Sequence, residues 1–462
     1  MSAHREPPRT VAVVGGGFSG VALTCALLRL ARRPLQITLV ERRPALGCGV
    51  AYGTGHPSHL LNVPAGRMGV DPLDEAGFAR YLTRQGHAGQ AHDFVPRPLY
   101  AGYLRQALQS AASTAAPGVG WAERHGDAVD CDGGSVAFSD SASLQADAVV
   151  LTNGHLPPQP PGLPQGPAWT EPGLVPDPWR PGALDAVPAD AQVLLLGSGL
   201  TAFDVLLQLR ARGHAGPLTL ASRRGLLPQA HRRLELAPQG GLVAPDALKG
   251  VLSARQLLNG VRALVRLAQA GGHDWRDVVA GLRPATPRLW QQLHESERHR
   301  FLRNLQPFWD THRHRTAPQA WTEVMAEVAS ARVQVLAARL TALLPAADGG
   351  WQVTLRARGG AAPTTLQADW VINCTGSSSD ARRTADPLMS QLVRSGAAVP
   401  DSLGLGLCVD HRYSLGAPPG RQPLRYLGPL LKAQHWEAVA VPELRLHAQT
   451  LAGMLVDELR LG

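Results

Sequence analysis

The stretch T-V-A-V-V-G-G-G-F-S-G-V-A-L-T-C-A-L-L, residues 10–28, decides the fold. Its apolar start predicts a short buried strand, its glycines a tight turn, and its apolar end a helix. Gly15, Gly17 and Gly20 supply the pattern G-x-G-x-x-G. In such a unit the first glycine makes the turn, the second lets a pyrophosphate approach the backbone, and the third lets helix and strand pack closely.

A second apolar strand, Gln36 to Val40, ends in Glu41, about 20 residues beyond the glycines. An acid at this place accepts hydrogen bonds from a ribose. A glycine triplet alone is weak evidence, because tight turns occur by chance. Triplet, strand context and terminal acid together predict a dinucleotide-binding unit.

A second copy of the pattern begins at Gln192: Q-V-L-L-L-G-S-G-L-T-A-F-D-V-L-L-Q-L. Gly197, Gly199 and Ala202 give G-x-G-x-x-A between an apolar strand and an amphipathic helix. The next strand, Leu218 to Ala221, ends in S-R-R-G instead of an acid. Arg223 and Arg224 suit a 2′-phosphate, which favours NADPH over NADH, although in an arginine-rich chain they could also be merely solvated.

Two such units, the acid-ended one first, predict an α/β flavoprotein with two Rossmann-like dinucleotide-binding domains. FAD would bind the first and a nicotinamide cofactor the second. Two further apolar strands, 147–155 ending in T-N-G-H and 369–376 ending in T-G, fit strands that close each nucleotide domain.

Several blocks beyond the glycines resemble the bacterial FAD-NAD(P)-binding proteins, relatives of flavin-containing and N-hydroxylating monooxygenases. They include G-V-A-Y-G-T (49–54), H-L-L-N-V-P-A-G-R-M (59–68), S-R-R-G-L-L-P (222–228), W-D-T-H-R-H-R-T-A-P (309–318) and W-E-A-V-A-V-P-E-L-R (436–445). The resemblance covers nearly the whole chain, and it names no substrate. The F-x-G-x-x-x-H signature of Baeyer–Villiger enzymes is absent, and Asn153 separates the threonine and glycine of the first closing strand.

The predicted domain plan follows the flavoprotein layout. An FAD domain covers 1–156 and resumes at 377–462, and a proline-rich connector spans 157–188. The nicotinamide domain covers 189–376. Within it, 244–330 departs from the strand–helix rhythm and predicts a helical insertion, with helices at 252–270 and 296–305.

Composition narrows the partners. The formal charge is +9, but 43 of the 45 basic residues are arginine and no block of like charges appears, so we expect neither a nucleic-acid nor a membrane partner. The five cysteines are scattered without a C-x-x-C, which fits a reducing cytoplasm and excludes a dithiol centre. The polar start leads into no cleavage site, so no signal peptide is predicted.

The stretch W-D-T-H-R-H-R, residues 309–315, is compatible with three interpretations: a metal site, a nucleic-acid contact or the polar wall of a pocket. Asp310, His312 and His314 fall on one face only if the segment is extended, and three ligands in one such stretch rarely converge on one ion. We therefore predict no metal. A structural junction is as well supported as a role in which an arginine neutralises an anion and a histidine relays protons.

The predicted site residues form two sets. The catalytic candidates, for which packing and capping roles are equally open, are Asn62, Arg97, His312 and His314. The cofactor-binding candidates are Gly15, Gly17, Phe18, Ser19, Gly20, Glu41, Gly154, Gly197, Gly199, Leu200, Thr201, Ala202, Arg223, Arg224, Gly376 and Trp436. Trp436 precedes a final helix whose N-terminus would face the flavin.

These observations favour an NADPH-dependent FAD monooxygenase. Its substrate would be a small polar molecule, possibly an amine, oxygenated through a flavin C4a-peroxide. One alternative is a flavin-dependent reductase or dehydrogenase that passes electrons to another acceptor. An alternative of another class is a non-catalytic nucleotide-binding redox sensor. Substrate, oxygenated atom and oligomeric state do not follow from the sequence.

Overall fold

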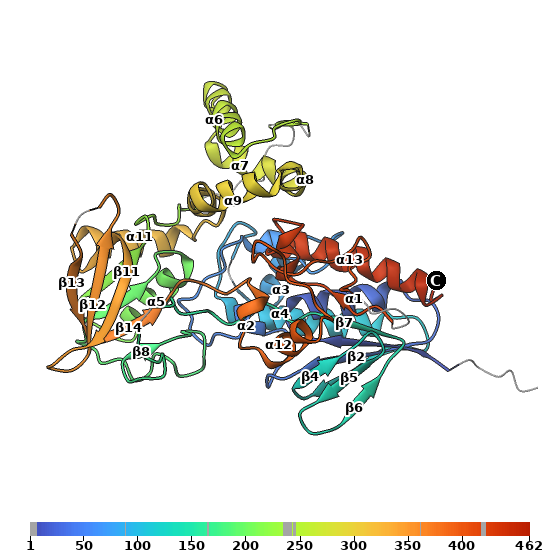
Figure 1. Cartoon of the computed structure of the whole chain (residues 1–462). Coiled ribbons are helices and arrows are strands. Elements are labelled where there is room, and N and C mark those ends of the chain that lie inside the picture. The colour runs from blue at the N-terminus through green and yellow to red at the C-terminus, as the bar shows by residue number, and fades with distance from the viewer. Residues whose placement is uncertain are drawn as a thin grey trace, which may run out of the picture. The chain divides into compact units, whose positions relative to one another are not determined.

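The computed structural model describes residues 7–87, 89–163, 166–233, 243, 246–360, 362–416 and 422–462. The chain forms two compact units (Figure 1). Unit 1 contains Met1–Gly55, Val63–Leu156 and Ser379–Gly462, and unit 2 contains His56–Asn62 and Pro157–Ser378. Residues 56–62 thus belong to unit 2 although they lie within the predicted 1–156 range.

A five-stranded parallel sheet forms the centre of unit 1, in the order β15-β7-β1-β2-β3. Its strands are β1 (Arg9–Val14), β2 (Leu35–Glu41), β3 (Val119–His125), β7 (Ala148–Leu151) and β15 (Arg425–Tyr426). Residues 11–14 of β1 and all of β7 are buried, as their unbroken apolar sequences predict for central parallel strands.

Helices cover this sheet, and a small antiparallel sheet adjoins it. The helices are α1 (Phe18–Leu30), α2 (Gly49–Tyr52), α3 (Gly77–Arg84), α4 (Arg97–Ser113), α12 (Pro387–Arg394) and α13 (Val441–Glu458), with short 3₁₀ turns at Ala65–Arg67, Ala381–Arg383 and Pro429–Ala433. The three-stranded sheet contains β4 (Ala128–Cys131), β5 (Ser135–Phe138) and β6 (Ser143–Gln145). Helix α1 packs against both α4 and α13.

Unit 2 is built on a seven-stranded sheet in the order β13-β12-β11-β10-β9-β14-β8. The strands are β8 (Leu174–Val175), β9 (Val193–Leu196), β10 (Leu218–Ser222), β11 (Val333–Pro345), β12 (Trp351–Ala357), β13 (Thr364–Ala368) and β14 (Trp370–Asn373). Strands β8 to β11 and β14 pair in parallel, whereas β12 and β13 are antiparallel. Helix α5 (Leu200–Ala211) follows β9. The parallel strands of the two sheets, with helices after β1, β2, β9 and β10, confirm the predicted α/β class.

Six helices lie between β10 and β11 in the described part of the chain. They are α6 (Ala254–Ala270), α7 (Trp275–Leu282), α8 (Thr286–Gln292), α9 (Glu295–Asn304), α10 (Gln306–Arg313) and α11 (Pro318–Ala329). Helices α6 and α9 confirm the two predicted helices. A small core of their own, including Ala268, Val278 and Leu289, holds α6, α7 and α8 together, and α6 stands away from the sheet (Figure 1).

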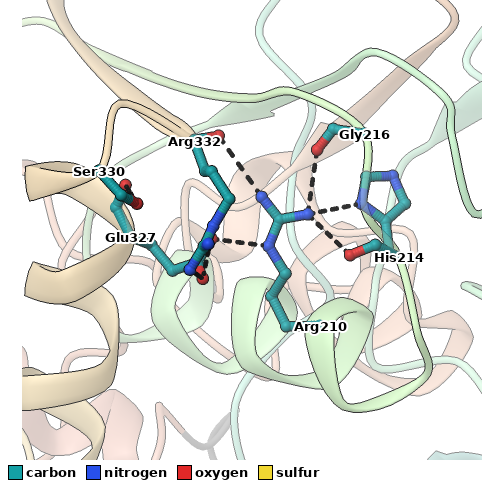
Figure 2. Close-up of polar contacts among 6 residues, drawn as sticks. All are labelled: Arg210, His214, Gly216, Glu327, Ser330 and Arg332. Carbon is teal, nitrogen blue, oxygen red and sulfur yellow. Dashed lines mark hydrogen bonds and ion pairs between the residues drawn. The ribbon is translucent and has the colours of Figure 1, made fainter.

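An ion-pair network ties α5 to the end of α11. Arg210 on α5 donates from Nε to Glu327 Oε2 at 2.8 Å and from Nη1 to the carbonyl of Gly216 at 3.0 Å (Figure 2). Arg332 donates from Nη2 to Glu327 Oε1 at 2.6 Å. The Arg210 and Glu327 side chains are only 15% and 13% exposed, so this carboxylate holds two arginines where water competes little.

None of the helices in the described segments has the length and the apolar character that crossing a bilayer requires.

Candidate functional site

The first glycine turn of unit 1 has a conformation that only glycine fits. Gly15 has φ +120°, and a Cβ added to it would lie 2.8 Å from the carbonyl carbon of Thr152. A Cβ on Gly20 would lie 1.9 Å from the Gly15 oxygen, so this glycine lets α1 pack close to the turn. The Thr152 hydroxyl donates to that same oxygen at 2.7 Å. Thr152, the residue that follows β7, thus holds the turn in this conformation.

Glu41 at the end of β2 fastens the same turn. Its side chain is buried, with 6% exposure. Oε2 accepts from the Gly16 N–H at 2.9 Å, and Oε1 accepts from the Arg43 N–H at 2.8 Å. A carboxylate has about four acceptor positions, so each oxygen retains capacity for a ribose hydroxyl.

A pocket opens between this turn and the last helix of unit 1. Its lining includes Gly15, Gly17, Phe18, Ser19, Glu41, Arg42, Arg43, Cys48, Tyr52, Asp127, Thr152, Asn153, Gly154, His155, Asp386, Leu388, Pro429, Val439, Val441 and Leu444. Val441 is the first residue of α13, so the positive end of that helix dipole faces the pocket. Arg42 pairs with Asp386 at 2.9 Å, and Arg43 donates to the Gly49 carbonyl at 2.7 Å.

The residues of this pocket fit FAD on two observations. A Cβ added to Gly17 or Gly154 would meet almost nothing, since its only neighbour within 4 Å is Gly49, 3.6 Å from Gly17. That space is what a pyrophosphate needs next to backbone N–H groups at a helix start. In addition, Asn153 Oδ1 is buried with no hydrogen-bond partner among the described residues. A cofactor hydroxyl or N–H would satisfy it.

Most predicted FAD residues line this pocket, and two do not. Gly20 instead allows α1 to pack closely against the glycine turn, which is the role predicted for the third glycine. Trp436 is 4% exposed, with the Lys432 ammonium 4.6 Å from its ring centre, and is not part of the lining. Its predicted cofactor contact therefore has no support in the pocket geometry.

The second glycine turn, in unit 2, repeats the first. Gly197 also has φ +120°, and a Cβ on it would lie 2.3 Å from the Cys374 carbonyl oxygen. Gly199 has open space around its Cβ position, and Ala202 on α5 is fully buried. Leu200 and Thr201 form the first turn of α5. Gly376 has φ +91° and open space at its Cβ position.

Two serine hydroxyls shape the turn after β10. Ser198 Oγ donates to the Leu226 carbonyl at 2.6 Å and lies 2.7 Å from Ser222 Oγ. Ser222 Oγ also accepts from the Gly225 N–H at 3.0 Å. These bonds fix the S-R-R-G turn next to the second glycine turn.

The two arginines of that turn differ in their surroundings. Arg223 is exposed. Arg224 donates from Nη2 to the carbonyls of Arg303 and Asn304, at 3.0 and 3.3 Å, at the end of α9. Burial, then the charges of Arg358 and Arg223, lower the pKa of Arg224. Part of the Arg224 guanidinium is therefore already hydrogen-bonded to the protein, which the sequence did not predict.

The four catalytic candidates fall in both units. Asn62 is in unit 2, where its carbonyl accepts from His231 Nε2 at 3.1 Å. Arg97 is the first residue of α4 in unit 1. Its charge acts on Tyr52 in the pocket wall: burial raises the pKa of Tyr52, and the positive charge of Arg97 opposes that shift.

His312 and His314 lie at the end of α10. The His312 ring packs on Trp275 with 4.8 Å between ring centres, and its Nδ1 is 2.8 Å from the Phe308 carbonyl. His314 Nε2 is 3.9 Å from Asp310 Oδ1. Within the described residues, no cluster of three or more potential metal ligands occurs.

The comparison with known proteins matched the part of the chain that contains this pocket's first glycine turn. Residues 12–156 match the model of a family described as FAD-NAD(P)-binding. Over this range the chain is similar to that family. The matched range contains the first glycine turn, Glu41 and the closing strand β7, which are the groups that build the pocket. The comparison with curated proteins found no match.

Solved structures of similar fold include an N-hydroxylase, a monooxygenase and a disulfide reductase. The ornithine N-hydroxylase of Kutzneria sp. 744 is 16% identical with a TM-score of 0.64, covering 98% of this chain and 100% of that one. L-lysine 6-monooxygenase from Pseudomonas syringae is 19% identical with a TM-score of 0.62, covering 97% and 99%. The bacillithiol disulfide reductase of Staphylococcus aureus is 10% identical with a TM-score of 0.54, covering 98% and 99%.

At these identities the neighbours show a shared fold. Asn153, Arg42 and Arg358 are the residues around the two turns that sequence reasoning missed. Asn153 could have been noticed from the sequence, because it interrupts the T-G pattern. Arg42 and Arg358 could not, because nothing local separates them from the many other arginines.

Proposed function

We propose that this chain is an NADPH-dependent FAD monooxygenase that oxygenates a small, polar, nitrogen-bearing substrate. The observation that carries the proposal is the pocket of unit 1, in which the glycine turn, Glu41 and the start of α13 line one space. The ornithine N-hydroxylase of similar fold is described with reduced FAD, NADP⁺ and L-ornithine, and supports the substrate class.

FAD would be held by groups along the whole pocket. The Gly17–Ser19 segment would bind the pyrophosphate, Glu41 the ribose, and Asn153 Oδ1 a hydroxyl or N–H of the cofactor. The chemistry supplied by bound FAD is acceptance of a hydride from NADPH and activation of dioxygen.

The chain itself contributes charge stabilisation and a dry environment. The backbone N–H groups at the start of α13 face the pocket, where their partial positive charge favours an anionic group. Leu388, Pro429, Val439 and Leu444 add apolar wall that limits access of water. Exclusion of water would limit side reactions of bound FAD.

The second turn supports the choice of NADPH. Gly197, Gly199 and the N-terminus of α5 would take the pyrophosphate, and Arg223 would bind the 2′-phosphate. Asn62, Arg97, His312 and His314 remain our candidates for contacts to substrate or flavin.

The cysteines weigh against a dithiol reductase. All five are free. Cys48 is the only one of them that lines the pocket of unit 1, and Cys25, Cys131 and Cys374 are buried. Burial raises the pKa of Cys25 to about 12, which keeps that thiol protonated and unreactive.

Oxygen-dependent NADPH consumption tests the proposal. The FAD-loaded protein is supplied with NADPH and a panel of small amines, and NADPH, oxygen and hydrogen peroxide are followed together. We expect one amine to stimulate oxygen-dependent NADPH consumption with little peroxide release. Equal turnover with artificial acceptors under anaerobic conditions would favour a reductase instead. Binding of both cofactors without sustained turnover would point to a sensor.

A further inference from the structure

A second pocket of unit 1 lies at the edge of the five-stranded sheet, next to β3. It is open to solvent and has a volume of about 450 Å³, within the range of about 300–1,000 Å³ that small-molecule sites occupy. Its lining includes Leu46, Arg105, Leu108, Trp121 and Glu123, and we call it the edge pocket. It shares no lining residue with the pocket proposed for FAD, so the two are separate.

The fold brings the edge pocket together from three elements: β3, helix α4 and the loop after β2. Trp121 and Glu123 are two residues apart in β3, so their side chains lie on one face of the sheet. Their β2 partners on that face are fully buried, whereas Trp121 is half-buried and Glu123 is exposed. Arg105 and Leu108 are three residues apart in α4 and therefore share one face of the helix.

The edge pocket holds one charge of each sign, and the protein neutralises neither. In the described part of the chain, the Glu123 carboxylate has no hydrogen-bond or ion-pair partner. Arg105 donates from Nη1 to the Leu46 carbonyl at 3.3 Å and lies 4.0 Å from Cys48 Sγ, but among the described residues it pairs with no carboxylate. A guanidinium has five N–H donors, so most of those of Arg105 remain available to a ligand.

These two charges select the kind of ligand. A simple anion would be attracted by Arg105 and repelled by Glu123, and a simple cation would meet the reverse, whereas a zwitterion satisfies both. Trp121 and Leu108 add apolar surface, and an indole ring stacks on aromatic rings. We propose that the edge pocket binds a small zwitterion with an aromatic body, the chemical class of the aromatic amino acids. Arg105 binds the carboxylate, Glu123 the ammonium group, and Trp121 stacks on the ring.

The loop 42–48 couples this ligand to the pocket proposed for FAD. Three residues of the loop line that pocket, and residues 44–46 line the edge pocket. Leu46 also packs on the glycine turn, because a Cβ added to Gly16 would lie 2.4 Å from its Cδ2. A ligand that takes Arg105 from the Leu46 carbonyl loosens this shared loop and weakens the binding of FAD. The coupling rests on the proposed binding of FAD to unit 1, and it is reciprocal.

A set of matched probes tests the site. L-phenylalanine is compared with phenylpropionate, which lacks the ammonium group, with phenylethylamine, which lacks the carboxylate, and with L-alanine, which lacks the ring. Ligand-observed NMR titration on the full-length protein measures the four dissociation constants. L-phenylalanine should bind with a dissociation constant of about 1 mM, and each of the other probes should bind about fivefold more weakly, the factor for one ion pair at a partly exposed site.

Single substitutions then separate the contacts. Arg105→Gln and Glu123→Gln should each weaken L-phenylalanine about fivefold. Arg105→Gln should not weaken phenylethylamine, and Glu123→Gln should not weaken phenylpropionate, because each probe already lacks the group concerned. Trp121→Ala should weaken all three probes that carry a ring, and Trp121→Phe, which keeps an aromatic ring, should retain most of the affinity.

Arg84→Gln is the matched control. Arg84 is exposed in the last turn of α3 and lies outside the lining of the edge pocket. This variant should leave all four dissociation constants unchanged. Circular dichroism confirms that each variant is folded.

Release of flavin tests the coupling. The FAD-loaded protein is diluted with and without saturating L-phenylalanine, and free flavin is followed by its fluorescence at equilibrium. L-phenylalanine should raise the dissociation constant of FAD about fivefold, at the lower end of the usual range for coupled sites. At an L-phenylalanine concentration that saturates only the wild type, Glu123→Gln should reduce this effect.

Each outcome has a separate meaning. Absence of L-phenylalanine binding, or equal binding of L-phenylalanine and both single-charge probes, would overturn the proposed zwitterion site. So would an affinity for L-phenylalanine that is unchanged in Arg105→Gln, Glu123→Gln and Trp121→Ala, because the ligand would then bind elsewhere. Binding at the edge pocket with unchanged flavin release would overturn the coupling alone. Failure of the chain to bind FAD would overturn the proposed function and the coupling, and would leave the probe titrations valid.

Discussion

Gly15 and Glu41 were predictable because each residue has a local reason to be where it is. A glycine is needed where φ is +120° and where a Cβ would touch Thr152. Glu41 ends a buried strand, so its side chain must find polar partners, and the Gly16 N–H is within reach. The structure adds that Glu41 also braces the glycine turn.

Gly15→Ala should abolish flavin retention. The added methyl would press on the backbone of Thr152 while the backbone keeps a left-handed φ, at a cost of about 1–3 kcal/mol for the strained conformation alone. The turn must shift, and the pyrophosphate loses its N–H groups. The ratio of flavin absorbance to protein absorbance after gel filtration measures the loss.

Gly453→Ala is the control for this substitution. Gly453 lies inside α13, and a Cβ there meets nothing within 4 Å. Alanine in a helix interior is favoured over glycine by about 1 kcal/mol, so this variant should keep its flavin and gain stability. A Gly15→Ala protein with full flavin content would show that the turn does not carry the cofactor.

Arg224 shows what residue-level reasoning misses. The sequence placed it beside Arg223 as an equal candidate for the phosphate. The structure directs its Nη2 to the end of α9, whose last carbonyls lack partners within the helix. The sequence does not show that a helix about 80 residues away would end there.

At the scale of elements, strand–turn–helix units were predicted best. Each has an apolar strand, a glycine turn and an apolar helix in a fixed order, and β1–α1 and β9–α5 follow it. Within the insertion, the sequence predicted α6 and α9 but not α7, α8, α10 and α11. Helices α7, α8 and α10 have only 8, 7 and 8 residues, and such short helices give little periodicity. Helix α11 is longer, with 12 residues, and was missed as well.

The stretch 309–315 illustrates that limit. An extended segment would have put His312 and His314 on one face. Residues 309–313 instead belong to α10, and His314 caps it. The helix turns the two rings apart, and His312 packs on Trp275 of α7.

The bond between α5 and the end of α11 makes unit 2 sensitive to acid. Hydrogen bonds from Arg332, and then from Arg210, lower the pKa of Glu327 below its usual value of 4.5 against the opposing effect of burial. A lowered folded-state pKa gives stability that is present above pH 4.5 and is lost as the pH falls through the folded-state pKa. Glu327→Gln should therefore lower the free energy of unfolding by about 1–3 kcal/mol at pH 7. The difference from wild type should shrink toward pH 3, as urea titrations at several pH values will measure.

Asp185→Asn provides the comparison for that prediction. Asp185 pairs with Arg212 at 2.8 Å in the same unit, but its side chain is 70% exposed. Exposed pairs contribute about 0–1 kcal/mol, so this variant should unfold nearly as the wild type does. Equal effects of the two substitutions would show that burial of the Glu327 network adds nothing.

At the scale of the whole molecule, the chain crosses between its units four times. The sequence predicted the crossings near 156 and 377 from the ends of the closing strands. The short excursion of 56–62 into unit 2 was not predicted, although His59 packs on Trp179 there with 5.4 Å between ring centres. A segment of seven residues is too short for its hydrophobic pattern to show which of the two cores it packs against.

The proposed binding of FAD to unit 1 and of NADPH to unit 2 predicts separable protection. Hydrogen exchange followed by mass spectrometry should show that FAD slows exchange in peptides around 15–20 and 41–52, and that NADP⁺ slows it around 197–202 and 222–225. Arg223→Ala should weaken the second effect and leave the first. If Arg223→Ala also reduced protection by FAD, the two sites would not be independent, and unchanged protection by NADP⁺ would argue against its phosphate contact.

The sequence by itself determined the two glycine turns, their order and the α/β class. Those features depend on neighbours in the chain: a φ only glycine adopts, an apolar strand, and an acid or arginine at its end. Only the tertiary structure decided which distant groups meet them: Thr152 under Gly15, Asn153 and α13 at the first pocket, and Arg358 and Phe308 at the second turn. These contacts arise from strand order and helix packing, and residues far apart along the chain carry no local sign that folding will place them together.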